Sequence, residues 1–172
     1  HTRNKELLKY AQTDALTGLY NKETTEQLTD ELLSEDENKS HAFLILDVDC
    51  FKQINDIYGH AVGDIVLQKF GKLLKGTFRE GDILGRIGGD EFGVIMKNIQ
   101  TKDIAMKKAE ELLAKTQAYK IDELKGNNIS ISIGISTAPQ DGDCYMDLYK
   151  RADQALYQAK RSGKARVCNY FS

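Results

Sequence analysis

Four acidic residues stand where carboxylates could do chemistry. Asp47 and Asp49 follow the apolar run 42–46, which is typical of a buried strand, and Asp90 and Glu91 follow a two-glycine turn. Carboxylates on adjacent strand ends can converge on Mg²⁺, a hard ion that takes oxygen ligands and shares them with substrate phosphates. Metals held in this way polarise phosphoryl oxygens. The residues alone leave open a plainer interpretation, in which these acids are solvated side chains beside turns.

Periodicity and glycine predict the elements that position these acids. We expect helices and strands in the order strand, helices, hairpin, helix, strand, helix, after two N-terminal helices. The hairpin turn falls at Gly88 and Gly89, because glycine tolerates the positive φ of a tight turn, and Gly163 suits a helix C-terminal cap. The predicted helices cover 2–12, 22–33, 51–58, 64–75, 101–116 and 147–161, and the predicted strands cover 42–46, 82–87, 92–96 and 129–136. This order predicts an α+β domain with a ferredoxin-like core, in which helices flank a mainly antiparallel sheet.

Bulk properties narrow the class of protein. The 172 residues suit one globular domain, and 41% of them are hydrophobic. The net charge is −2 with both signs interleaved, which excludes a long basic groove for a nucleic acid polymer but allows a small phosphate ligand. The three cysteines have no metal-binding spacing, so we expect free thiols in a reducing cytoplasm.

Domain organisation is expected to be simple. No apolar run approaches the roughly 18 residues of a membrane span, so we expect no direct membrane contact by this chain. Because the chain begins at His1 rather than Met, we expect residues 1–12 to be a helix or linker from an absent upstream region. That region could anchor the parent protein in a membrane, and residues 13–172 would form the domain itself.

Several segments resemble, in order, the motifs of one family. Residues 88–92 read GGDEF, the signature of GGDEF domains, the diguanylate cyclases that join two GTP molecules into cyclic di-GMP. Other matching segments lie between about residue 13 and residue 164: 14–21 (DALTGLYN), 47–56 (DVDCFKQIND), 59–64 (GHAVGD), 132–134 (SIG) and 152–160 (ADQALYQAK). The chain is identified as a member of this family, which implies a nucleotidyl-cyclase-like fold.

The resemblance implies a Mg²⁺ or Mn²⁺ site at the acidic residues. Asp47, the main-chain carbonyl of Val48 and Asp90 would hold the metals. Either Asp90 or Glu91 would be the general base that takes the proton from the ribose 3′-hydroxyl, and the sequence does not choose between them.

GTP would be recognised by Asn55 and Asp64. Guanine presents N1–H and N2–H₂ side by side, and one carboxylate can accept both, whereas adenine would leave a carboxylate unpaired. Asp64 is otherwise a helix-start acid favoured by the macrodipole. The N–H groups of Cys50 and Phe51 would hold phosphate, as helix starts do. Three lysines would neutralise the triphosphate: Lys52, Lys160 and Lys164. Lys164 stands where the family commonly has arginine and would bind phosphate more weakly.

The segment from Arg79 to Asp82 matches the family's inhibitory RxxD site. Five residues separate Asp82 from Gly88, which is the spacing of that site. The resemblance implies that Arg79 makes bidentate contacts to guanine or phosphate of the product, while Asp82 accepts from guanine. The alternative is a surface ion pair that contributes ~0–1 kcal/mol.

These expectations combine into one functional hypothesis. Two domains, each with one GTP, would meet as a homodimer, form cyclic di-GMP, release two pyrophosphates and be inhibited by their product. A non-catalytic cyclic di-GMP receptor is the alternative, although its signature is usually eroded and this one is intact. A cyclase making a mixed or adenine-containing dinucleotide is a second alternative, which Asp64 disfavours.

Overall fold

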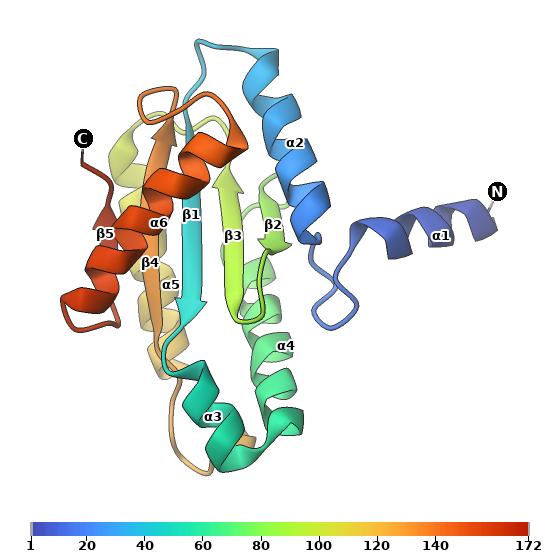
Figure 1. The fold of residues 1–172 in the computed structure, drawn as a ribbon, viewed down its shortest axis with the longest axis vertical. Helices are drawn as coiled ribbons and strands as arrows, with labels where there is room; N and C mark the ends of the chain where they lie inside the picture. Colours follow the sequence, from blue (N-terminus) through green and yellow to red (C-terminus); the bar gives the residue numbers. More distant parts are fainter. Residues whose placement is uncertain (1, 172) are drawn as a thin grey trace.

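A computed structural model describes residues 2–171 (Figure 1). The helices are α1 (Thr2–Gln12), α2 (Lys22–Glu35), α3 (Phe51–Tyr58), α4 (His60–Thr77), α5 (Lys102–Ala118) and α6 (Tyr145–Arg161), with a 3₁₀ turn η1 (Asp122–Leu124). The strands are β1 (His41–Val48), β2 (Ile83–Arg86), β3 (Glu91–Met96), β4 (Ile131–Ala138) and β5 (Val167–Asn169).

One five-stranded sheet organises the chain in the order β2-β3-β1-β4-β5. All neighbours are antiparallel except β4 and β5, which run parallel. The predicted α+β fold, with a mainly antiparallel sheet flanked by helices, is confirmed. The short strand β5 was not predicted, because three residues carry too little periodicity to be distinguished from a loop.

Helices cover both faces of the sheet, with α2 and α6 on one side and α4 and α5 on the other (Figure 1). Side chains alternate along β1: Leu44 and Leu46 pack in the core beneath α4 and α5, whereas Phe43 and Ile45 pack beneath α2 and α6. Covered on both faces, β1 is buried along its whole length, which explains its continuous apolar run. The same alternation turns Asp47 toward α6.

The sequence-based expectation was wrong in several details. Helix α4 begins at His60 rather than at residue 64, because Gly59, with φ of +91°, reverses the chain immediately after α3. Strand β4 lies two residues later than predicted. Neither hairpin glycine has a positive φ. The connection spans residues 87–90, with the N–H groups of Ile87 and Gly88 both donating to the Glu91 carbonyl, and a loop of that length needs no left-handed residue.

Helix α1 stands away from the sheet (Figure 1). None of its described side chains is buried, and Leu7, Leu8 and Tyr10 are exposed. Across residues 2–171, every helix is too short or too polar to cross a membrane.

Helix α6 lies unusually close to β4 at Gly134. A Cβ on Gly134 would lie 2.1 Å from the carbonyl oxygen of Ala152 and 2.4 Å from the nitrogen of Leu156. Backbone is therefore packed directly on backbone, and this close contact fixes the position of α6 against the middle of β4.

We predict that Gly134→Ala destabilises the domain by about 1–3 kcal/mol or more, because the methyl group has no space unless α6 moves. Gly76→Ala is the matched control: it lies in α4, has open space around a Cβ, and should gain up to ~1 kcal/mol of helix propensity. Urea denaturation of both variants measures the difference. Equal stabilities would contradict the close packing of α6 on β4.

Candidate active site

The structure brings Asp47, Asp90 and Glu91 together at one end of the sheet. In the β1–β3 register Asp47 pairs with Glu91, and the Val48 N–H donates to the Asp90 carbonyl at 3.3 Å. The Asp47 and Asp90 side chains lie against each other. Antiparallel pairing is therefore what places acids 43 residues apart in sequence side by side.

Burial and like charge dominate the electrostatics of this cluster. Burial, with the Asp90 carboxylate beside it, raises the pKa of Asp47 to about 7, although Lys160 acts in the opposite direction. Burial also raises the pKa of Glu91, assisted by Asp153 and Asp90 and opposed by a hydrogen bond from Tyr149. A set of partly buried carboxylate oxygens that repel one another fits a divalent cation such as Mg²⁺ or Mn²⁺.

Asp49 has a different role from Asp47. Its carboxylate accepts hydrogen bonds from the hydroxyls of Ser130 and Ser132, both at 2.6 Å, and from the N–H of Ala165 at 3.1 Å. These bonds tie the end of β1 to β4 and to the turn after α6. Of the two acids that follow the apolar run, only Asp47 belongs to the cluster with Asp90.

Helix α6 supplies the groups that face the acids. The Lys160 ammonium pairs with Asp47, and although burial opposes it, Asp47 and Asp90 together raise the pKa of Lys160. The Tyr149 hydroxyl donates to Oε1 of Glu91 at 2.8 Å. Tyr149 was not predicted as a site residue. The sequence feature that could have identified Tyr149 is helical spacing. Successive separations of four and seven residues place Tyr149, Asp153 and Lys160 on one face of α6.

The predicted phosphate site lies where β1 turns into α3. Cys50 adopts a left-handed conformation with φ of +55° and precedes the first residue of the helix, Phe51. The Lys164 ammonium lies 3.1 Å from the Cys50 sulfur, and Lys52 is exposed on the first turn of α3. The segment after α6 thus brings Lys164 to this turn. That these residues bind phosphate stays a prediction.

The two predicted guanine-binding residues lie on adjoining helices. Asn55 is on α3 and the exposed Asp64 is on α4. A Cβ on Gly63 would lie 1.9 Å from Oδ1 of Asn55, so the glycine allows the Asn55 amide to pack against α4 at the residue that precedes Asp64. Their base recognition stays a prediction.

Arg86 anchors the acidic hairpin, a role that sequence reasoning missed. Its guanidinium donates to the Gly89 carbonyl through Nε at 3.1 Å and through a terminal nitrogen at 2.8 Å, and pairs with Asp14 at 3.2 Å. Burial opposes ionisation of Asp14, but hydrogen bonds from Thr17 and the charge of Arg86 hold its pKa below the usual value. The turn after α1 is therefore fastened to the loop that carries Asp90.

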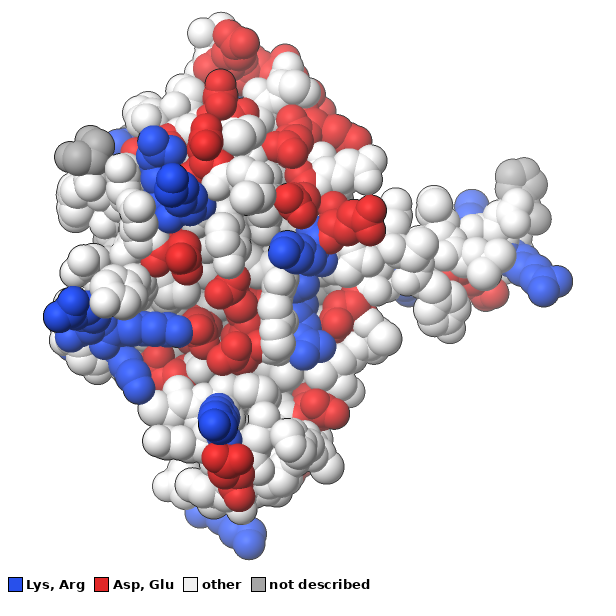
Figure 2. Space-filling model, in the orientation of Figure 1, with Lys and Arg blue, Asp and Glu red and all other residues white. Residues whose placement is uncertain are grey.

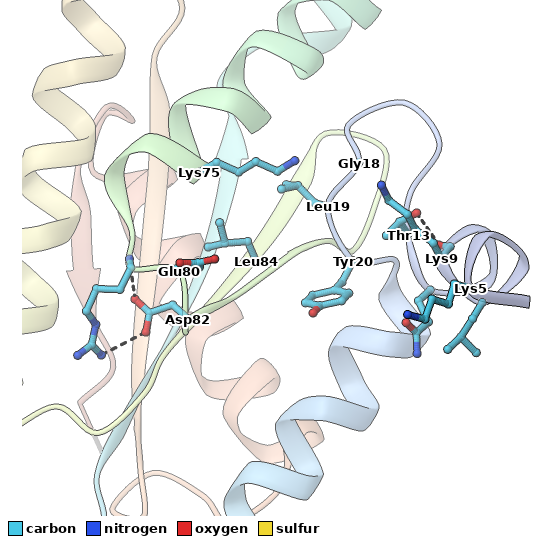
Figure 3. Close-up of a pocket in the computed structure, with 13 residues that line it drawn as sticks. Lys5, Lys9, Thr13, Gly18, Leu19, Tyr20, Lys75, Glu80, Asp82 and Leu84 are labelled. Carbon is cyan, nitrogen blue, oxygen red and sulfur yellow. Dashed lines mark hydrogen bonds and ion pairs between the residues drawn. The ribbon is translucent and has the colours of Figure 1, made fainter. Parts of the chain in front are cut away.

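Arg79 and Asp82 border a cavity of about 620 Å³ (Figure 3). The Asp82 side chain is only 2% exposed; it pairs with Arg79 at 3.2 Å and accepts from the N–H of Lys97 at 3.1 Å. The Arg79 side chain is 60% exposed, and Lys75 of α4 and Lys9 of α1 also line the cavity. Arg79 is thus the solvent-accessible residue of this ion pair, and the buried Asp82 carboxylate orients its guanidinium.

Charge is distributed in groups over the face that Figure 2 shows. Acidic side chains gather in the region of α2 and again in the middle of this face, and basic side chains gather at the edge near the C-terminal end of α6. Both signs are therefore present close to the strand ends that carry the acidic cluster.

The sheet order and the acidic strand ends define a nucleotidyl-cyclase-like α+β domain. A family model described as "Diguanylate cyclase, GGDEF domain" matches residues 11–166, and the chain belongs to this family.

Individual relatives agree with this assignment. The chain is 37% identical over 170 residues to diguanylate cyclase A of Treponema denticola, covering 95% of this chain and 46% of that protein. It is 38% identical over 165 residues to the response regulator PleD of Caulobacter vibrioides, covering 93% of this chain and 36% of that protein. The chain thus spans less than half the length of these curated relatives.

Solved structures show the same fold. The coiled coil and GGDEF domain of DgcB from Caulobacter crescentus, in complex with c-di-GMP, superimposes with a TM-score of 0.89 at 26% identity, covering 98% of this chain and 90% of that one. The active GGEEF domain of a diguanylate cyclase from Vibrio cholerae gives 0.82 at 29% identity, covering 88% and 97%.

We predict that the metal-free domain loses stability between about pH 4 and pH 7. A carboxyl whose pKa is raised on folding, as for Asp47 from 3.8 to about 7, favours the folded state at low pH, and this contribution is lost as pH rises through 7. Thermal denaturation should show a fall of a few degrees, and Mg²⁺ should reverse it at pH 8 because the cation replaces the bound proton.

Asp47→Asn should flatten this pH dependence, and Glu37→Gln, an exposed acid before β1, should leave it unchanged. A slope that is the same in Asp47→Asn and the parent would show that the dependence arises elsewhere.

Proposed function

We propose that this chain is a diguanylate cyclase domain that condenses two GTP molecules into cyclic di-GMP and releases two pyrophosphates. The observation that carries the proposal is the convergence of Asp47, Asp90 and Glu91 at the strand ends, with Lys160 facing them from α6. A relative named diguanylate cyclase A, at 37% identity over 95% of the chain, supports it.

In this proposal Asp47, Asp90 and the Val48 carbonyl hold Mg²⁺ or Mn²⁺. The bound metal would polarise the α-phosphate and favour ionisation of the ribose 3′-hydroxyl. Asp90 or Glu91 accepts the 3′-hydroxyl proton; the 3′ oxygen then bonds to the α-phosphorus of the other GTP, and the bond to pyrophosphate breaks. Lys160, Lys164 and Lys52 bind and orient the triphosphate, so that positioning and charge supply most of the rate.

Base selection follows from the α3–α4 pair. Asn55 and Asp64 accept and donate along the guanine edge, and the Asp64 carboxylate takes both N1–H and N2–H₂. The main-chain N–H groups of Cys50 and Phe51 bind phosphate oxygens at the start of α3. An adenine at this position would place its N1 acceptor, in place of the guanine N1–H donor, against the carboxylate, which disfavours the mixed-dinucleotide alternative.

Each domain binds one GTP, so the reaction requires two domains facing each other with their acidic strand ends together. A homodimer is therefore the active form. We propose that residues 13–172 are the cyclase domain, that residues 1–12 continue a helix from an upstream region, and that the domain works in the cytoplasm.

We predict that the chain converts GTP with Mg²⁺ into cyclic di-GMP and pyrophosphate, and that Asp90→Asn lowers this rate by about 10²-fold or more, because one oxygen ligand and its charge are lost. Pyrophosphate release and chromatography of the nucleotide products measure both. With ATP in place of GTP no cyclic dinucleotide should form. A dimer-enforced chain that binds cyclic di-GMP but forms none would favour the receptor alternative.

Product inhibition is proposed to act through the cavity beside Arg79. The exposed guanidinium makes bidentate contacts to guanine or phosphate of cyclic di-GMP, and the nearby ammonium groups of Lys75 and Lys9 add positive charge. The volume of about 620 Å³ is within the range of small-ligand sites.

We predict that Arg79→Ala raises the cyclic di-GMP concentration needed for half inhibition by at least about tenfold, since a charge-assisted bidentate contact contributes roughly 1.5–3 kcal/mol. Initial turnover should stay close to that of the parent. Lys102→Ala, a matched cationic change at the start of α5, is the control. Unchanged inhibition in Arg79→Ala would remove Arg79 from the regulatory site.

A further inference from the structure

We propose that Tyr149 is a positioning residue that fixes the Glu91 carboxylate for the cyclase reaction. This inference rests on the proposed function. Its hydroxyl donates to Oε1 of Glu91 at 2.8 Å, from a helix 58 residues further along the chain. Among residues 2–171, no group donates to Oε2 of Glu91, so that oxygen is left for the reacting centre.

The charges around Glu91 explain why a neutral donor is useful at this position. Asp90 and Asp153 face Glu91 with like charge, and Lys160, the cation nearby, pairs with Asp47. Without a donor, repulsion would turn the Glu91 side chain toward solvent. A phenol holds one oxygen without neutralising the carboxylate, so the second oxygen can still accept a proton or bind a cation.

The Tyr149 ring packs against other aromatic rings. It stacks on Tyr145, with centroids 5.9 Å apart and planes at 28°. Tyr145 is 1% exposed and meets the ring of Phe43 edge-on at 5.4 Å. Phe43 lies four residues before Asp47 on β1, so this aromatic column runs from the strand that carries Asp47 to the oxygen of Glu91. Stacking restricts the Tyr149 ring, so orienting Glu91 costs less side-chain entropy than an unpacked donor would.

Helix geometry adds a second link. Tyr149 and Lys160 lie on the same face of α6, and the close contact at Gly134 holds the middle of this helix against β4. One rigid helix thus places a neutral donor on Glu91 and a cation on Asp47. Burial and the Glu91 carboxylate raise the pKa of the Tyr149 phenol, so it remains a donor throughout the neutral range.

Tyr149→Phe tests the inference, because it removes only the hydroxyl and keeps the stacked ring. We expect turnover at saturating GTP and Mg²⁺ to fall about tenfold or more, as for other groups that orient a ligand or a base. The KM for GTP should change by less than about twofold, because Tyr149 does not contact the nucleotide in this scheme. The control is Tyr157→Phe, an exposed tyrosine on the same helix, which should keep the parent's turnover. The thermal midpoints of the two variants should agree.

A double-mutant comparison with Glu91 distinguishes a positioning role of Tyr149 from any other role. In a Glu91→Gln background the change Tyr149→Phe should lower the remaining turnover no further, because the carboxylate it orients is gone. An active parent with undiminished Tyr149→Phe turnover would overturn this inference alone, and so would an equal loss in both backgrounds. A parent that forms no cyclic di-GMP would overturn the proposed function and this inference together.

Discussion

Mutual repulsion between Asp47 and Asp90 is the constraint around which this end of the molecule is organised. Antiparallel pairing of β1 with β3 holds the two acids together where burial weakens solvation of their charges. Such a pair is stable only if cations or donors surround it. Lys160 provides a cation from α6, and α6 can do so because Gly134 lets it pack directly on β4.

The loops beside this pair are fixed by separate anchors rather than by the acids themselves. Asp49 bonds to two serines and to the turn after α6, and Arg86 holds the hairpin carbonyl of Gly89 against the Asp14 turn. Each anchor joins segments distant in sequence. A site in which charges repel needs this support, because small backbone shifts would let the carboxylates separate into solvent.

The cavity beside Arg79 and the acidic hairpin are joined by a single short strand. Asp82 comes directly before β2, and Arg86 is the last residue of β2, four residues later. Asp82 fixes Arg79 at one end, and Arg86 fixes the Gly89 loop at the other. The Arg79–Asp82 ion pair and the anchored hairpin are therefore connected through a strand of four residues. Helix α1 borders the same cavity through Lys9, so this region also adjoins the N-terminal helix (Figure 3).

Local patterns in the sequence were enough for the fold class, most elements and the family. The apolar run before Asp47, the GGDEF hairpin and the helical face of α6 are all local signals, and the motifs kept their order along the chain. The three-residue strand β5 and the true conformation of the hairpin glycines were beyond such patterns, since both depend on pairing with other strands. Which polar groups serve structure and which stay free was decided only by the tertiary structure. Asp47 and Asp49 look equivalent in sequence, yet residues more than 80 positions away engage Asp49, and a tyrosine from α6 reaches Glu91, because packing alone determines which distant side chains meet.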